Sequence, residues 1–286
     1  MTAVRDVTGR LATWLRRLMP DGDRQAALMT ELAAFRDDDR PVTAELCARV
    51  EAAAWRVSRH VALIFEPDGT GAPDTEARQW PRQDPAAVRA RAGSVSQARR
   101  LPDGTALIRV DGLDEAGLAA PYVDAAFTLA RGARRLVLDL RANGGGDPAT
   151  VALIAGWLLG DEAVRLSEVV DRDGRRQWWT ADRPPGSALT LDTTVLVGPG
   201  TFSSGEALAY HLRARDRVLV VGEATPGAAD HVLPVRLAPT VLAHVPRAYV
   251  VDAVTGTNWE GTGVVPHRVV PVDQALDAAL SGSFPG

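Results

Sequence analysis

The stretch LVLDLRANGGGD, Leu136 to Asp147, decides the fold class. Its first half is a nearly continuous apolar run, which is typical of a strand buried on both faces of a sheet. Three consecutive glycines follow and allow positive φ angles, a close approach to a ligand, and an anion-binding arrangement of backbone amides. The next segment, PATVALIAGWLLG (148–160), indicates a helix. The order is strand, tight glycine turn, helix.

The same alternation continues on both sides of this stretch. Further strands are predicted at TALIRVDGL (105–113), TVLV (194–197) and RVLVV (217–221), and further helices at 119–132 and 204–215. Strands that alternate with helices predict an α/β core with parallel pairing. After Gly222 the pattern changes to strands and loops, and the chain ends in a short helix, VDQALDAAL (272–280).

The N-terminal part follows a different pattern. VTGRLATWLRRLM (7–19) and TAELCARVEAAAWRVSRHV (43–61) carry apolar residues at helical spacing, and HVALIFEPDGTG (60–71) alternates like a strand that ends in a turn. Residues 72–98 contain Pro, Arg and Gln with little periodicity. We therefore predict an N-terminal helical subdomain at 1–71, a linker or surface excursion at 72–98, and the main α/β domain at 99–286.

Composition excludes several classes of protein. The 286 residues carry a net charge of −4 and no long basic block, so nucleic acid and anionic membranes are not expected as partners. No run is long enough to span a membrane, and the N-terminus lacks the apolar core of a signal peptide. We expect a cytoplasmic protein.

The chemistry available to the chain is limited. All 32 basic residues are arginine, so no lysine can act as a base or form a Schiff base. The single cysteine, Cys47, excludes an intramolecular disulfide and a multi-thiolate zinc site. Its apolar helical surroundings favour a buried structural role over a nucleophilic one. We expect neither a metal nor a cofactor.

A candidate nucleophile lies in GPGTFSSGEALAYHL (198–212). Ser203 and Glu206 have the spacing of a capping box, which begins many helices. A helix N-terminus also stabilises negative charge, including the oxyanion that develops on a substrate carbonyl. The capping role and the nucleophilic role thus favour the same position, and the sequence alone does not separate them.

A candidate carboxylate lies in VTGTNWEGTGVVPH (254–267). Glu260 is flanked by small, turn-forming residues and precedes a predicted strand. It is either a solvated loop residue, as most such carboxylates are, or a group that supports a catalytic site.

A serine nucleophile needs a base, and without lysine an imidazole is expected. His60 and His231 lie at the ends of predicted elements, where site residues tend to lie. His211 is on the helix of Ser203 but two turns away, and the other two lie in strand-like runs. The five histidines are His60, His211, His231, His244 and His267.

Four segments in this order resemble the C-terminal processing (tail-specific) peptidase family. They are LVLDLRANGGGDPATVALIAGWLLG, GTFSSGEALAYHL, RVLVVGEATPG and VTGTNWEGTGVVP. The resemblance is stronger to the branch related to interphotoreceptor retinoid-binding protein, with tricorn protease as a distant relative. It extends from about Val57 to Ala279 and implies a ClpP/crotonase-like core of ββα units. A PDZ domain, frequent in tail-specific enzymes, is not expected here.

The resemblance implies roles for particular residues. Ser203 corresponds to the nucleophile, Glu260 to the supporting glutamate and His60 to the base. The backbone N–H groups of Ser204 and of Gly144 or Gly145 correspond to the oxyanion hole. The loop TPGAADHV (225–232) departs from the family pattern, which leaves His231 as an alternative base.

Three kinds of function remain at this stage. The first is a serine peptidase that cleaves a peptide bond. The second is another acyl-transfer enzyme, such as an esterase, cyclase or acyltransferase, that acts on a small metabolite. The third, which the retained motifs disfavour, is a binding protein. Trp178 and Trp179 are candidates for a substrate cleft or a homo-oligomer interface.

Overall fold

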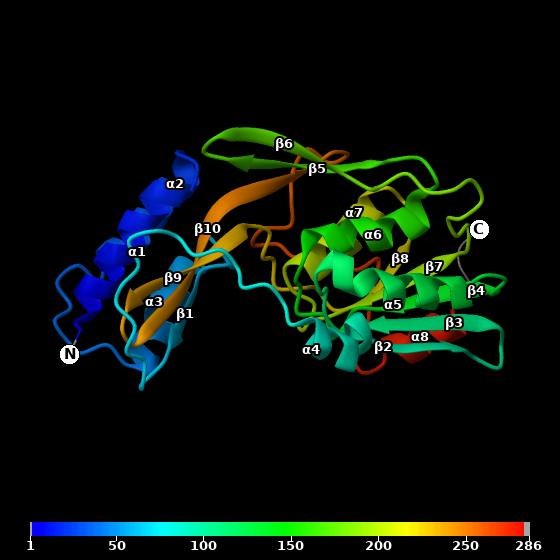
Figure 1. Cartoon of the computed structure of the whole chain (residues 1–286), viewed down its shortest axis with the longest axis horizontal. Helices are drawn as coiled ribbons and strands as arrows, with labels where there is room; N and C mark the ends of the chain where they lie inside the picture. The colour runs from blue at the N-terminus through cyan, green and yellow to red at the C-terminus, as the bar shows by residue number, and fades with distance from the viewer. Residues whose placement is uncertain (1, 283–286) are drawn as a thin grey trace. The chain divides into compact units, whose positions relative to one another are not determined.

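The structure, a computed structural model, describes residues 2–282. The chain forms two compact units (Figure 1), each built from separate stretches of sequence. The first contains Met1–Pro81, Val169–Arg176 and Ala228–Val251, and the second contains the rest. The outer ends of the predicted subdomains, residues 1 and 286, lie outside the described residues. Within residues 2–282, no helix combines the length and hydropathy that a membrane crossing requires.

The first unit packs three helices against an antiparallel sheet. Strand β10 is central and pairs with β1 and with β9. The core between helices and sheet includes Leu11, Leu28, Val50, Val235 and Ala243, all at most 1% exposed. Its elements are α1 (Val4–Leu18), α2 (Asp23–Ala33), α3 (Ala44–Ala54), β1 (Ala62–Phe65), β9 (His231–Ala238) and β10 (Val241–Asp252).

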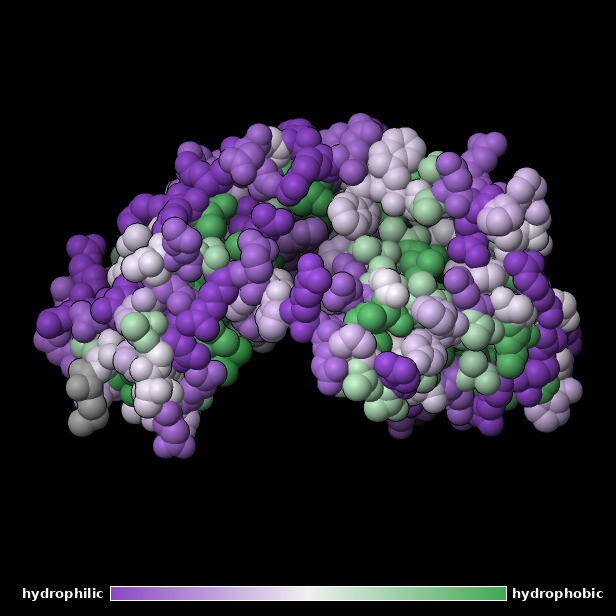
Figure 2. All heavy atoms as spheres, viewed as in Figure 1, coloured by the Kyte–Doolittle hydropathy of each residue, from purple (hydrophilic) through white to green (hydrophobic). Residues whose placement is uncertain are grey.

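The sheet of β10 continues into a hairpin in the order β1-β10-β5-β6. The hairpin consists of β5 (Arg165–Asp171) and β6 (Gly174–Trp179), and its tip, Val169–Arg176, belongs to the first unit. Every residue of β6 except Trp178 is exposed, and the outer surface of the hairpin is largely hydrophilic (Figure 2).

The second unit contains the α/β core predicted from the alternating pattern. Its six-stranded sheet has the order β11-β8-β7-β4-β3-β2. The pairs from β3 to β11 are parallel and only β2 is antiparallel, so the predicted parallel core is confirmed. The strands are β2 (Val95–Arg100), β3 (Thr105–Val110), β4 (Arg135–Asp139), β7 (Thr193–Val197), β8 (Leu219–Gly222) and β11 (Arg268–Val269).

Helices cover both faces of this sheet. On one face, α8 packs on Leu107, Val137, Leu196 and Val221, one residue from each of four adjacent strands. On the other face lie α5, α6 and α7 (Figure 1). The helical elements are α4 (Pro85–Ala90), the short 3₁₀ helix η1 (Ala92–Ser94), α5 (Ala116–Leu129), α6 (Pro148–Leu159), α7 (Ser204–Ala214) and α8 (Ala275–Ser281).

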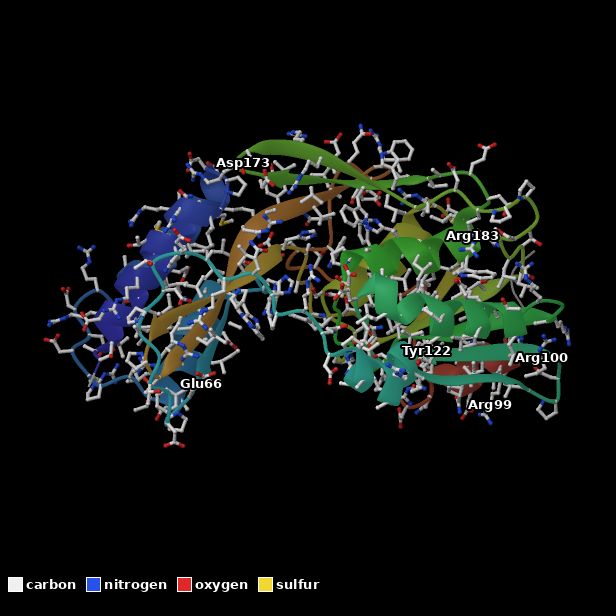
Figure 3. The ribbon with its side chains drawn as sticks, in the orientation of Figure 1. Glu66, Arg99, Arg100, Tyr122, Asp173 and Arg183 are labelled. Carbon is white, nitrogen blue, oxygen red and sulfur yellow. The ribbon has the colours of Figure 1, made fainter. Side chains whose placement is uncertain are left out.

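The β2 edge of this sheet is protected by charge. Arg99 and Arg100 (Figure 3) are exposed on β2. The guanidinium of Arg100 donates hydrogen bonds to the carbonyls of Leu129, Arg131 and Gly132, at the end of α5. Basic groups at a helix C-terminus satisfy its last carbonyls, and charges on an edge strand discourage pairing with another chain.

Candidate active site

Ser203 lies at the turn between β7 and α7, as predicted, but its backbone is not that of an ordinary cap. It is the N-cap of α7 with φ 52° and ψ −119°. N-cap residues usually have extended backbones, and a positive φ is costly for a residue with a side chain. Such strain persists only where the surroundings impose it, and it is concentrated at functional sites. A strained serine at a strand-to-helix turn is the arrangement of a nucleophile elbow.

Glu206 holds this turn in place. Its carboxylate accepts hydrogen bonds from the backbone N–H of Ser203 at 2.8 Å, the hydroxyl of Thr225 at 2.5 Å and the backbone N–H of Gly227 at 2.7 Å. The residue is completely buried. The predicted interaction of Glu206 with the helix start is therefore present, and the same carboxylate also binds the loop after β8.

The glycine turn lies directly against Ser203. A Cβ atom on Gly145, whose φ is 95°, would come within 2.9 Å of both the Ser203 Cβ and the Phe202 carbonyl oxygen. The Ser204 hydroxyl donates to the carbonyl of Gly146 at 2.8 Å. The turn after β4 and the start of α7 are thus joined, which places the glycines beside both serines.

Two N–H groups of this turn, those of Gly144 and Gly145, already have acceptors. Gly145 donates to the Oδ1 atom of Asn143 at 3.0 Å, and Gly144 donates to the carbonyl of Asp111 at 3.4 Å. Asn143 is fully buried and its Nδ2 donates to the carbonyl of Val110 at 2.9 Å. For Gly144 or Gly145 to bind an oxyanion, the corresponding bond must be given up or shared.

Glu260 lies in a turn that contacts the same loop. The N–H of Gly261 donates to the carbonyl of Gly227 at 2.8 Å, and the N–H of Gly227 is bound by Glu206. Glu260 itself is half-buried, and its N–H donates to Oδ1 of Asn258 at 2.9 Å. The structure therefore links the turn of Glu260 to the helix of Ser203 through one buried carboxylate.

The first unit holds the preferred candidate base, His60, which is buried just before β1. Burial lowers its pKa to about 4, although the charge of Asp230 and a hydrogen bond with the Asp230 backbone oppose the shift. Asp230 is buried and binds both Arg24, at 2.7 and 2.9 Å, and the hydroxyl of Ser58, at 2.7 Å. An imidazole in this setting is neutral at pH 7.

The alternative base, His231, begins β9 in the same unit. Burial lowers its pKa to about 4 as well, and the nearby charges of Arg247 and His60 act in the same direction. The pKa values of both candidate bases therefore lie below the unperturbed histidine value of about 6.5, so both imidazoles are neutral at pH 7.

The remaining histidines make structural contacts. His244 lies on β10 with its ring edge-on to Trp80, and Nδ1 of His267 accepts from the N–H of Val220 at 2.9 Å. His211 is buried against Asp252. Cys47 is buried, as predicted, and burial raises the pKa of its thiol to about 11, so the thiol is not ionised at pH 7. Among residues 2–282, no group of three or more metal-binding side chains is placed to hold an ion.

Comparisons with known proteins agree with the sequence motifs. The model of peptidase family S41 matches residues 104–270, and the chain belongs to this family. A segment of 92 residues is 38% identical to carboxyl-terminal-processing peptidase 2, chloroplastic, of Arabidopsis thaliana, and one of 97 residues is 30% identical to the carboxy-terminal processing protease CtpA of Bacillus subtilis. The resemblance stated from the sequence is confirmed.

These relatives are matched only in part. The segments cover 32% and 34% of this chain but 17% and 20% of the relatives, so the chain spans at most about a fifth of their length. Solved structures resemble it over 98% of its length. A candidate peptidase from Parabacteroides merdae has a TM-score of 0.67 and a lipoprotein from Streptococcus agalactiae one of 0.59, each at 16% identity over 96% of its own chain. These likenesses establish the fold.

Proposed function

We propose that this protein is a serine hydrolase that cleaves peptide bonds, with Ser203 as its nucleophile. The observation that carries the proposal is the strained backbone of Ser203 at the start of α7, held by the buried carboxylate of Glu206. A serine that only caps a helix needs no such strain. In a nucleophile, the strained turn exposes the hydroxyl to substrate, and the positive end of the helix dipole stabilises the negative charge that develops there. Membership of the S41 family supports the same assignment.

The proposed reaction proceeds through an acyl-enzyme. The Ser203 hydroxyl attacks the substrate carbonyl carbon while a neutral imidazole, His60 in the first instance, takes its proton. The tetrahedral oxyanion is bound by the N–H of Ser204 together with that of Gly144 or Gly145. The imidazolium then gives its proton to the leaving amine. In the second half of the reaction the imidazole takes a proton from water, the water oxygen attacks the acyl carbon, and the imidazolium returns a proton to the Ser203 oxygen as the acid leaves. Glu260 supports the charge that develops on the imidazole.

The test is active-site labelling combined with substrate profiling. A fluorophosphonate probe should label the wild-type protein at Ser203, and a mixed peptide library should yield cleavage products that the labelled protein no longer makes. Labelling with ester hydrolysis but no peptide cleavage would select the alternative acyl-transfer function. A protein that is folded but is not labelled and has no hydrolytic activity would contradict both.

A further inference from the structure

His211 and Asp252 form a buried pair that the proposed reaction does not use. Nδ1 of His211 lies 2.7 Å from Oδ2 of Asp252, and the two side chains are 4% and 0% exposed. Arg215 donates to the same oxygen at 3.0 Å. Burial lowers the pKa of His211 despite the charge of Asp252, so the imidazole is neutral and donates its Nδ1 proton to the carboxylate. Burial raises the pKa of Asp252, but the hydrogen bonds from His211 and the Thr255 backbone outweigh it and keep the pKa low.

Asp252 in turn closes the loop that leads to Glu260. Its Oδ1 accepts from the N–H groups of Val254 at 2.8 Å and Thr255 at 3.0 Å, and its own N–H donates to the carbonyl of Thr257 at 2.8 Å. The segment 252–257 is therefore folded around the carboxylate that His211 holds.

Trp259 continues this connection to the residue beside Glu260. Its ring is 2% exposed and meets the His211 ring edge-on, with centroids 5.8 Å apart, and the Tyr210 ring at 5.2 Å. Its carbonyl accepts from the N–H groups of Thr262 at 3.2 Å and Gly263 at 2.8 Å, which closes the turn around Glu260.

Helix α7 thus holds the turn of Glu260 at two places. Glu206, in its first turn, reaches Gly261 through Gly227. His211, about one and a half turns later, contacts the Trp259 ring directly and binds Asp252, which closes the segment before Trp259. We propose that His211 is a positioning residue for Glu260, which fixes the supporting carboxylate relative to the helix that carries Ser203. This inference rests on the proposed function, because it matters to the reaction only if Glu260 supports it.

Two substitutions separate the hydrogen bond from the packing. His211→Phe keeps a ring against Trp259 and removes the donor, while Arg215 remains to pair Asp252. His211→Asn removes the ring and keeps an N–H donor at the position of Nδ1. We expect His211→Phe to lower kcat about tenfold or more with KM within about threefold, and His211→Asn to recover most of kcat.

The decisive experiment is a double-mutant cycle with Glu260→Gln, in which kcat, KM and melting temperature are measured for each protein. If His211 acts through Glu260, His211→Phe lowers kcat in the wild-type background and adds less than about twofold in the Glu260→Gln background. Equal effects in both backgrounds, or a fall in melting temperature with unchanged kcat per folded molecule, would overturn the inference. A fully active Glu260→Gln single variant would instead reject the role of Glu260 in the proposed function.

Discussion

The carboxylate of Glu206 accepts a hydrogen bond from the backbone N–H of Ser203 at 2.8 Å, and both lie at the start of one helix. The same carboxylate binds Thr225 and Gly227, which are remote along the chain and belong to the loop after β8. The backbone conformation of the candidate nucleophile is thus maintained by a group that also anchors the neighbouring loop.

Glu206→Gln should therefore destabilise the protein. One side-chain oxygen would become an NH₂ group that faces donors, and an unsatisfied buried polar group costs about 1–3 kcal/mol. Denaturant unfolding would measure the loss. The control is Glu162→Gln, the same substitution at an exposed position, which should change the unfolding free energy by less than about 0.5 kcal/mol. Equal effects at the two positions would contradict the role given to Glu206.

Gly145 and Gly144 offer a paired test of the turn beside Ser203. A methyl group on Gly145 would collide with the Ser203 Cβ and the Phe202 carbonyl, whereas one on Gly144 would meet no atom within 4 Å. We expect Gly145→Ala to lower kcat/KM by at least about 10², because the geometry at the nucleophile shifts. Gly144→Ala should lose much less. The opposite ranking would show that the contact between Gly145 and Ser203 is unimportant for activity.

The pH dependence of activity follows from the buried imidazole. A general base acts when deprotonated, and burial lowers the pKa of His60 to about 4. The value of kcat/KM should therefore rise with pH through about 4 and be nearly level from about pH 6 to 8. A rise centred between pH 6 and 7 would mean that the base titrates as an exposed histidine does.

The pH profile does not distinguish the two candidate bases, because the pKa of His231 is also lowered to about 4. Substitutions do distinguish them. Loss of a general base typically lowers the rate by about 10² to 10⁴. We expect this loss for His60→Ala and a much smaller one for His231→Ala, measured per folded molecule by circular dichroism and activity together. An inactive His231→Ala beside an active His60→Ala would transfer the role to His231.

Glu260→Gln should lower the turnover number with little change in melting temperature, since Glu260 is half-buried in a turn that backbone N–H groups close: Gly261 donates to the carbonyl of Gly227 and Gly263 to that of Trp259. The paired measurement is kcat and a thermal melt of the same preparation. A large fall in melting temperature with normal activity of the folded fraction would make Glu260 a structural residue.

The sequence predicted most of the second unit because its signals are local. The apolar run Leu136–Leu140, the glycines after it and the spacing of Ser203 and Glu206 each act within one strand, turn or helix. The first unit was harder to predict, since β9 and β10 pack on helices that precede them by about 200 residues. Periodicity shows that a strand has a buried face but does not show which helix covers it.

The site shows the same division. The turns of Ser203 and Glu260 could be located from motifs, but the contacts that tune them could not. Asp230 binds Arg24, 206 positions earlier, and Glu206 binds Thr225 and Gly227 across a strand. The lowered pKa of His60 arises mainly from burial in the tertiary structure, which the residues next to it in the sequence do not reveal.

The most direct test of the account is to map the site of fluorophosphonate labelling by mass spectrometry in the wild-type protein, Ser203→Ala and Ser204→Ala. We predict an adduct on Ser203 of the wild type and none on folded Ser203→Ala. Ser204→Ala should still be labelled, more slowly, because the hydroxyl that it loses donates to the Gly146 carbonyl beside the nucleophile. Two results would contradict the assignment of Ser203 as the nucleophile. One is an adduct on the Ser203→Ala protein, and the other is a Ser204→Ala protein that is not labelled while the other two proteins are.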